Sequence, residues 1–209
     1  MRAWLIISGS VAKDTIEFYR TIRINSGDLI IAVDGGYDNA VLFGMLPSVV
    51  IGDLDSINSS ISKGTKIMKF PAEKDKTDLE LAIDYAIEEG FTEIVVLGNI
   101  GGKTSHSLAN IMLLKYIQSK NCEGMLLSAK ERVSLLKCGN TSIPRSESKY
   151  LSIIPLTSCE NVTILNTKYE IRNANIEVGS THLISNEFTA LDAKISIEKG
   201  EALVIAEKT

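Results

Sequence analysis

Cysteine and histidine are scarce in this sequence, which has three cysteines and two histidines among its 209 residues. The thiols of Cys122, Cys138 and Cys159 are scattered along the chain and odd in number, and none belongs to a Cys-x-x-Cys pair. Neither a zinc site nor a disulfide framework is therefore expected. We expect the three thiols to be buried or to have no part in function.

Long apolar runs and basic blocks are also missing. No stretch approaches the roughly 18–20 apolar residues that span a bilayer, and the apolar run at 2–8 is too short for the core of a signal peptide with its flanks. We therefore expect a cytoplasmic protein with no membrane partner. The net charge is −4. Because nucleic-acid binders neutralise phosphates with clustered Lys and Arg, a nucleic-acid partner is not expected either.

Apolar residues, in contrast, are plentiful. At 44% hydrophobic residues the chain can bury a substantial core, which excludes a disordered protein. Its length fits one large domain or two small ones. In the first two thirds, short apolar runs bounded by glycine and polar residues predict buried parallel strands at 2–8, 29–33, 48–51, 65–69, 93–97 and 124–128.

Helical patterns lie between most of these runs. The clearest covers 77–89, where Thr77 and Glu80 form a capping box and Gly90 ends the helix. Its apolar face is expected to consist of Leu79, Ala82, Ile83, Ala86 and Ile87. A second helix is predicted at 105–119, with a buried side made of Leu108, Ile111, Met112 and Leu113. This alternation predicts an α/β domain at 1–138 with a doubly wound, mostly parallel, Rossmann-like sheet.

The pattern changes near Asn140. The stretch 139–149 is polar and contains Pro144, which predicts a linker or surface loop. Short segments with strand character follow, and no long amphipathic helix is visible among them. They predict a small all-β domain at 139–209, a β-sandwich with strands at 150–154, 162–165, 176–178, 193–197 and 202–206.

Acidic residues of the first domain gather at predicted strand ends and at a helix start. They are Asp34, Asp53, Asp55, Asp75 and Asp78. Because the carboxyl ends of parallel strands line one crevice, we expect these carboxylates to converge there. Packed carboxylates repel each other unless a cation lies among them, and Mg²⁺ is the cation that suits such oxygen ligands.

Any one of these aspartates could be an ordinary loop or helix cap. The unit from Gly52 to Ser56 is less easily explained in that way. Alternate residues of an extended loop point to the same side, so Asp53 and Asp55 can bind one ion.

Glycines mark a second part of the expected site. Gly35 and Gly36 follow Asp34, and Gly101 and Gly102 precede the second helix. Glycine allows a phosphate to approach the backbone, and a helix N-terminus offers free N–H groups, although the spacing of a P-loop is absent. His106 lies on the first turn of that helix, where we expect it to hold a substrate or an aspartate rather than to act as an acid or base.

These residues resemble, in order and over nearly the whole chain, the motifs of the thiamine pyrophosphokinase family. The matching segments are Asp34-Gly35-Gly36, Phe43 to Pro47, Gly52-Asp53-Leu54-Asp55-Ser56, Lys74-Asp75-Lys76-Thr77-Asp78-Leu79-Glu80, Gly101 to Asn110, Lys168-Tyr169 and Ser185-Asn186-Glu187-Phe188. The resemblance implies an ATP-binding catalytic α/β domain, a thiamine-binding β-sandwich and a homodimer with sites at the subunit interface. It also implies a reaction in which the hydroxyl of thiamine attacks the β-phosphorus of ATP, giving thiamine diphosphate and AMP.

The resemblance also implies a role for each matching residue. Mg²⁺ ligands would be Asp53, Asp55 and Asp75, and Asp78 would join them as a catalytic residue. The residues that bind ATP would be Asp34, Gly35, Gly52, Lys74, Thr77, Gly101, Gly102, Lys103, His106 and Asn110. The thiamine pocket would include Ser185 and Asn186, contributed across the dimer interface.

One departure from the family pattern affects the turn before the second helix. The family's Arg-x-Asp-His is Lys103-Thr104-Ser105-His106 here. Lys keeps the positive charge of Arg without its bidentate fork, and Ser105 cannot act as a carboxylate. Two alternatives therefore stay open: a related diphosphokinase that acts on a pterin alcohol, and a nucleotide- or thiamine-binding paralogue with weakened catalysis. The match at 185–188 argues against the first.

Overall fold

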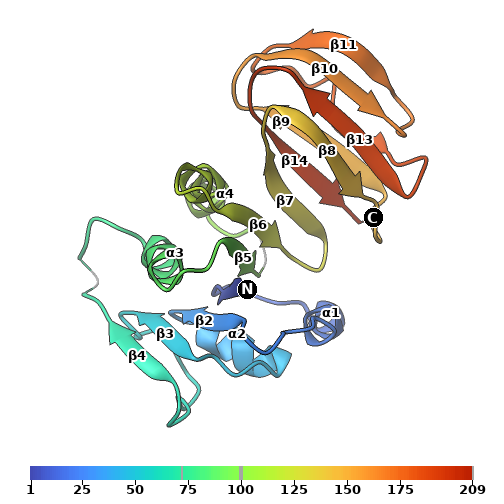
Figure 1. Ribbon diagram of the computed structural model, residues 1–209. Helices are drawn as coiled ribbons and strands as arrows, with labels where there is room; N and C mark the ends of the chain where they lie inside the picture. Colours follow the sequence, from blue (N-terminus) through green and yellow to red (C-terminus); the bar gives the residue numbers. More distant parts are fainter. Residues whose placement is uncertain (72, 99–100, 209) are drawn as a thin grey trace. The chain divides into compact units, whose positions relative to one another are not determined.

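The computed structural model describes residues 1–71, 73–98 and 101–208, which divide into two compact units, Met1–Ala129 and Lys130–Thr209 (Figure 1). We expected the boundary between 138 and 139. It lies earlier because strand β7 (Glu131–Leu136) pairs along its length with β14 (Ala202–Glu207), the last strand of the chain. Among the described residues, no helix combines the length and the apolar character needed to cross a bilayer.

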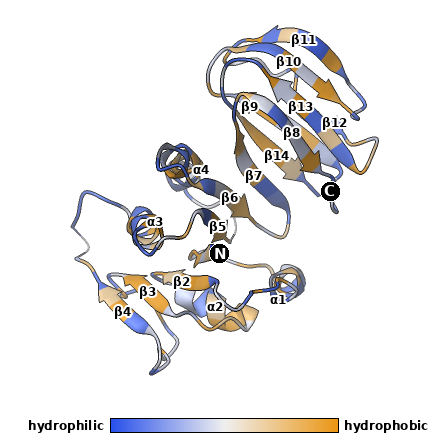
Figure 2. Ribbon diagram, viewed as in Figure 1, coloured by the Kyte–Doolittle hydropathy of each residue, from blue (hydrophilic) through white to orange (hydrophobic). Residues whose placement is uncertain are grey.

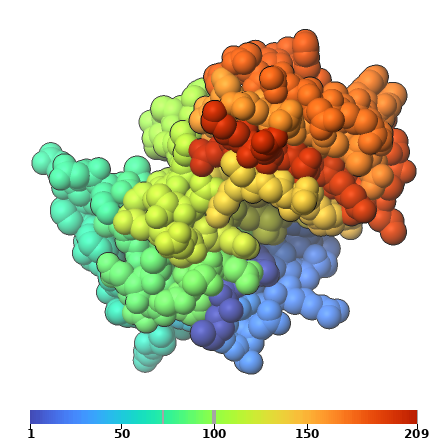
Figure 3. Space-filling model, turned by 45° about the horizontal axis from the view of Figure 1, so that its top comes forward, coloured from blue at the N-terminus to red at the C-terminus, as the bar shows by residue number. Residues whose placement is uncertain are grey.

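The first unit contains a parallel sheet in the order β4-β3-β2-β1-β5-β6. This confirms the predicted Rossmann-like class. The turquoise residues around the edge strand β4 lie at the margin of this unit in Figure 3. The strands are β1 (Arg2–Ile6), β2 (Leu29–Val33), β3 (Val49–Gly52), β4 (Lys66–Lys69), β5 (Glu93–Leu97) and β6 (Glu123–Leu127).

Helices cover both faces of this sheet. On one face, α1 (Ile16–Arg20) and α2 (Gly36–Phe43) pack over Trp4 and Ile6 of β1, with the rings of Tyr19 and Phe43 stacked at 4.1 Å; the short helix η1 (Lys13–Thr15) precedes α1. The other face carries α3 (Asp78–Glu88) and α4 (Thr104–Ser119). The close approach of α2 to β1 depends on Gly36, where a Cβ would lie 2.0 Å from the carbonyl oxygen of Ile6.

Helix α3 confirms the sequence prediction at both ends. The Thr77 hydroxyl accepts a hydrogen bond from the Glu80 N–H at 3.2 Å, and Gly90 ends the helix with φ +88°. The expected buried side of α4 is wrong at Leu108 and Met112, which are 58% and 49% exposed, whereas Ile111 and Leu113 are half-buried. Gly124 of β6 provides the reason: it lets Leu114 and Ile117 approach the sheet, so the buried stripe lies elsewhere on the helix.

The second unit consists of two antiparallel sheets that share one core, as predicted for a β-sandwich. Their strand orders are β12-β9-β14-β7 and β11-β10-β13-β8. Along β13, buried apolar residues alternate with polar ones, whereas β14 is apolar over nearly its whole length (Figure 2). The remaining strands are β8 (Gly139–Pro144), β9 (Tyr150–Pro155), β10 (Cys159–Leu165), β11 (Ile171–Ile176), β12 (Asn186–Glu187) and β13 (Asp192–Ile197).

Two predictions in this unit are wrong. The expected linker at 139–149 begins with strand β8, which pairs with β13 from Gly139 opposite Ile197 to Pro144 opposite Asp192. The strand is polar because it lies at the sheet edge, and Pro144 is tolerated as its last residue. The strand expected at 176–178 is β11, which ends at Ile176 and owes its position to pairing with β10.

Candidate functional site

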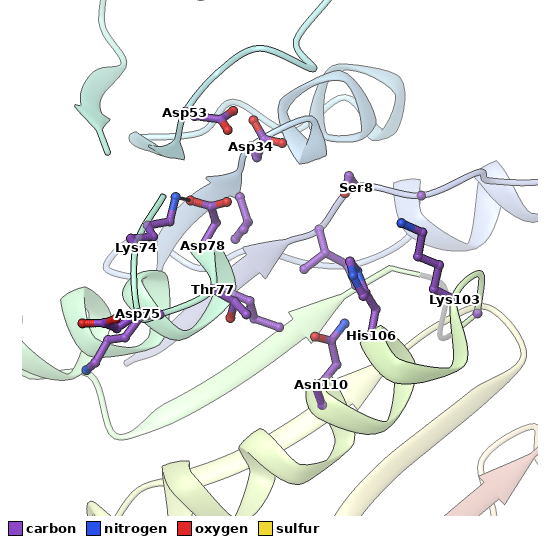
Figure 4. Close-up of a pocket in the computed structure, with 17 residues that line it drawn as sticks. Ser8, Asp34, Asp53, Lys74, Asp75, Thr77, Asp78, Lys103, His106 and Asn110 are labelled. Carbon is purple, nitrogen blue, oxygen red and sulfur yellow. Dashed lines mark ion pairs between the residues drawn. The ribbon is translucent and has the colours of Figure 1, made fainter. Parts of the chain in front are cut away.

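A cavity of about 600 Å³ lies in the first unit, at the carboxyl ends of β1, β2 and β3 and beside the starts of α3 and α4 (Figure 4). It is the crevice in which the sequence predicted a site. Most of the predicted residues of this unit line it, namely Asp34, Asp53, Lys74, Asp75, Thr77, Asp78, Gly101, Lys103, His106 and Asn110.

Three carboxylates meet at one side of this cavity. Asp34 follows β2, and Asp53 and Asp55 follow β3, with ligand oxygens that all lie within 4.8 Å of one another. The backbone is bent to achieve this, since Asp34 has φ +48° and Leu54 has φ +71°. Such left-handed conformations cost energy in residues other than glycine and are typical of functional sites.

Gly52 allows the two strand ends to come this close. A Cβ at position 52 would lie 2.9 Å from the Cβ of Asp34, and its φ of +155° is one that other residues rarely adopt. The predicted importance of Gly52 therefore has a steric basis in the acidic cluster itself. Gly35 has a similar constraint, because its Cβ would lie 2.8 Å from the Ser56 hydroxyl.

The electrostatics of the acidic cluster favour a bound cation. The hydrogen bond and the charge of Asp53 raise the pKa of the Asp55 carboxyl, and the charges of Asp34 and Asp78 add to this. Asp34 accepts a 2.5 Å hydrogen bond from Ser56 through Oδ2, while its buried Oδ1 has no hydrogen-bond partner among the described residues. Crowded anionic oxygens with an unsatisfied buried acceptor fit a hard divalent ion such as Mg²⁺.

Asp75, which we expected as a metal ligand, lies outside this cluster. It is on the loop that precedes α3, and in Figure 4 it points away from Asp34 and Asp53. Asp34 takes its place because β2 and β3 are neighbouring parallel strands that end at the same edge. Asp34, which the resemblance assigned to ATP binding, thus lies in the acidic cluster, as its place at a strand end predicted.

Lys74 and Asp78 form an ion pair beside the acidic cluster, with 2.8 Å between Nζ and Oδ1. Their side chains are only 14% and 25% exposed, so the pair is held firmly at the cavity wall. Lys74 also donates to the carbonyl oxygen of Pro71. The lysine that the family resemblance assigned to ATP binding is therefore anchored at the cavity wall by two contacts.

The start of α4 forms the opposite wall. Lys103 is the N-cap residue, and its side chain makes no capping hydrogen bond. His106 and Asn110 lie one turn apart and face the cavity (Figure 4). Ser105 is an exposed residue at the second helical position, so the position at which the family has Asp is not the N-cap.

The loop after β1 is a part of the site that the sequence analysis missed. Ile7, Ser8 and Gly9 line the cavity, and Asn39 of α2 donates to the carbonyl oxygens of Ile7 at 2.9 Å and Gly9 at 3.1 Å. The sheet order reverses between β1 and β5, and ligands of such folds bind at this switch point. This loop could not be identified from the sequence, because the sequence does not give the order of the strands in the sheet.

The predicted thiamine residues belong to the second unit. Ser185 is exposed, with φ +55°. Asn186 is buried, and its amide has all its hydrogen bonds within the unit: Oδ1 accepts from Tyr169 and Glu187, and Nδ2 donates to Thr167 and Tyr169. Four bonds fill the capacity of a side-chain amide. Asn186 therefore shapes this region through its amide, and its predicted contact with thiamine stays a prediction.

Comparison with known proteins identifies the family of this chain. Residues 22–126 match the family model "Thiamin pyrophosphokinase, catalytic domain", and residues 140–201 match "Thiamin pyrophosphokinase, vitamin B1 binding domain". The chain belongs to the thiamin pyrophosphokinase family. The two matched segments fall within the two structural units.

Individual relatives agree with this assignment. The thiamine pyrophosphokinase of Bacillus subtilis (strain 168) is 34% identical over 184 residues, which cover 85% of this chain and 86% of that protein. Thiamin pyrophosphokinase 1 of Caenorhabditis elegans is 26% identical over 197 residues, with coverages of 87% and 79%. A crystal structure of the Bacillus subtilis thiamine pyrophosphokinase superposes with a TM-score of 0.86 at 28% identity, over 100% of this chain and 99% of that one.

Proposed function

We propose that this member of the thiamin pyrophosphokinase family transfers the diphosphoryl group of ATP to the hydroxyl of thiamine, giving thiamine diphosphate and AMP. The observation that carries the proposal is the convergence of Asp34, Asp53 and Asp55 on one side of a cavity of about 600 Å³. The match of the chain to both domains of the family supports it.

Transfer of a diphosphoryl group requires positioning and charge neutralisation more than covalent chemistry by the protein. Asp34, Asp53 and Asp55 would hold Mg²⁺, which would neutralise phosphate charge. Lys74, fixed by Asp78, supplies a positive charge on the same wall. Asp75 lines the cavity without joining the acidic cluster, and we assign it to orienting substrate groups.

The start of α4 is suited to the phosphates. Gly101 and Gly102 are exposed, and because they have no side chains a phosphate could approach their backbone. The first turn of the helix offers free N–H groups at the positive end of its dipole. Lys103 adds a charge there. His106 and Asn110 would orient a substrate through their polar ends, and Thr77 keeps α3 in place as its N-cap.

Thiamine would contact Ser185 of a second copy, in a homodimer with sites at the subunit interface. Leu108 and Met112 support such an assembly: they are exposed apolar side chains one turn apart on α4, beside the cavity residues Ala109 and Asn110. A two-fold dimer is also the commonest soluble oligomer. Light scattering should give a dimer at assay concentration. A fully active monomer would contradict the shared site.

Product analysis tests the reaction. With ATP, Mg²⁺ and thiamine, we expect AMP and thiamine diphosphate in equal amounts. ADP together with thiamine monophosphate would contradict diphosphoryl transfer, because the β-phosphorus would then not have been attacked. Transfer to a pterin alcohol in preference to thiamine would reassign the acceptor while leaving the ATP site unchanged.

A further inference from the structure

Helices α3 and α4 both begin at the cavity, and each carries residues of the proposed site at its first turns. Thr77 and Asp78 lie at the start of α3, and His106 and Asn110 lie on α4. The distance between these groups depends on how the two helices are held against each other. Polar side chains farther along both helices hold them together.

Asp84, in the second half of α3, connects α4 to the segment just before α3. Its Oδ1 accepts a hydrogen bond from the Tyr116 hydroxyl of α4 at 2.5 Å. Its Oδ2 accepts one from the Lys76 ammonium at 2.5 Å. Lys76 directly precedes Thr77, the N-cap of α3. One carboxylate thus joins α4 to the residue before the first turn of α3.

Further charged and aromatic groups surround Lys76, Asp84 and Tyr116. Lys76 lies 3.5 Å from the Glu80 carboxylate and 5.8 Å from the centre of the Tyr116 ring. The ammonium of Lys120 lies 5.2 Å from the centre of the same ring. Tyr116 and Lys76 each donate a hydrogen bond to Asp84, and this bond raises the pKa of the donor in both cases. Both donors therefore keep their protons at neutral pH.

We propose that Lys76, Asp84 and Tyr116 form a clamp that fixes the start of α3 relative to α4, so that Thr77 and Asp78 are held in register with His106 and Asn110. All three are positioning residues for the proposed reaction, on which this inference rests. Lys76 lines the cavity, and its ammonium is paired with Asp84 and lies 3.5 Å from the Glu80 carboxylate, so the proposal assigns it to the clamp and not to phosphate binding.

A simple stabilising salt bridge is a weaker explanation. Exposed ion pairs contribute little to stability, and Lys76 is 43% exposed. Small displacements of groups that orient phosphates, in contrast, can reduce rates strongly even when they arise away from the reacting atoms. The clamp is therefore expected to affect turnover far more than the melting temperature.

Tyr116→Phe is the decisive variant, because it keeps the ring and removes only the hydroxyl that reaches Asp84. We expect kcat to fall about tenfold with KM for thiamine within about twofold of wild type. Tyr85→Phe is the matched control: Tyr85 lies on α3 next to Asp84, but its hydroxyl contacts Lys66 of β4, outside the cavity. This control should behave as wild type.

Two further comparisons separate positioning from direct phosphate binding. Combining Tyr116→Phe with Asp84→Ala should reduce kcat about as much as Asp84→Ala alone, because alanine already removes the carboxylate that accepts from the Tyr116 hydroxyl. Lys76→Met should reduce kcat about as much, and Lys76→Arg should restore it, since a guanidinium can still pair with Asp84. Additive losses, or a wild-type kcat in Tyr116→Phe, would overturn the clamp.

Binding of ATP with Mg²⁺, measured by calorimetry without thiamine, keeps this test separate from that of the reaction. If the wild-type protein forms no AMP, the proposed function fails, and the clamp is judged by nucleotide affinity alone. Tyr116→Phe should then bind MgATP about fivefold more weakly than Tyr85→Phe. Equal affinities would overturn the clamp.

Discussion

Asp53→Asn should lower kcat for AMP formation by at least about a hundredfold, because electrostatic stabilisation of phosphate charge carries much of the barrier lowering in this class of reaction. Asp53 lies between Asp34 and Asp55 in sequence and shares their acidic cluster, so the change removes one charge from the expected Mg²⁺ ligands. Asp55→Asn should have a similar effect. The fold should survive both changes, since Asp55 is exposed and Asp53 lies on a loop.

Asp14→Asn is the matched control, an exposed aspartate of the same unit on η1, away from the cavity. It should leave kcat and Mg²⁺ affinity unchanged. A readout independent of activity is available in the Asp55 carboxyl, whose pKa is raised chiefly by Asp53. In Asp53→Asn that pKa should return toward its ordinary value in an NMR titration. Full activity in both Asp53→Asn and Asp55→Asn would exclude the proposed metal site.

The second large effect is expected at Ser105, where the family usually has Asp. A capping role does not explain that Asp, since Lys103 is the N-cap of α4 and Ser105 is the second helical residue. Serine has no ionised form near neutral pH and cannot replace a carboxylate that orients a cation or an attacking hydroxyl. Because His106 and Lys103 on either side line the cavity, we expect Ser105→Asp to raise kcat by at least about tenfold.

Ser107→Asp is the control for this gain, since it places the same charge on the same turn, about 200° around the helix. A rise in Ser105→Asp alone would indicate a specific carboxylate, and an equal rise in both would indicate only a favourable interaction with the helix dipole. An unchanged rate in Ser105→Asp would contradict the prediction. Very low wild-type activity with a large gain in Ser105→Asp would favour the alternative of a catalytically weakened paralogue.

The acidic cluster could be predicted from sequence because it depends on local patterns. Asp34 and Asp53 each follow a short apolar run, and parallel strands bring such ends to one edge. Which aspartates share the cluster could not be predicted, because this depends on strand order. The neighbouring strands β2 and β3 select Asp34, whereas Asp75 stays on the loop before α3.

The errors have a common cause in contacts between distant residues. The polar segment 139–144 is a strand only because β13, about fifty residues later, pairs with it. The buried side of α4 is set by Gly124 on the next strand, which admits Leu114 and Ile117. The amide of Asn186 is likewise saturated by Thr167, Tyr169 and Glu187. Local periodicity contains no information on any of these partners.

The origin of the transferred phosphorus tests the central claim most directly. Wild-type protein is supplied with Mg²⁺, thiamine and ATP that carries an isotopic label only on its β-phosphorus, and the products are separated. The proposed reaction predicts that the label leaves with thiamine diphosphate, on the phosphorus bound to the thiamine oxygen, and that the AMP is unlabelled. Label retained in ADP, with an unlabelled thiamine phosphate, would contradict it.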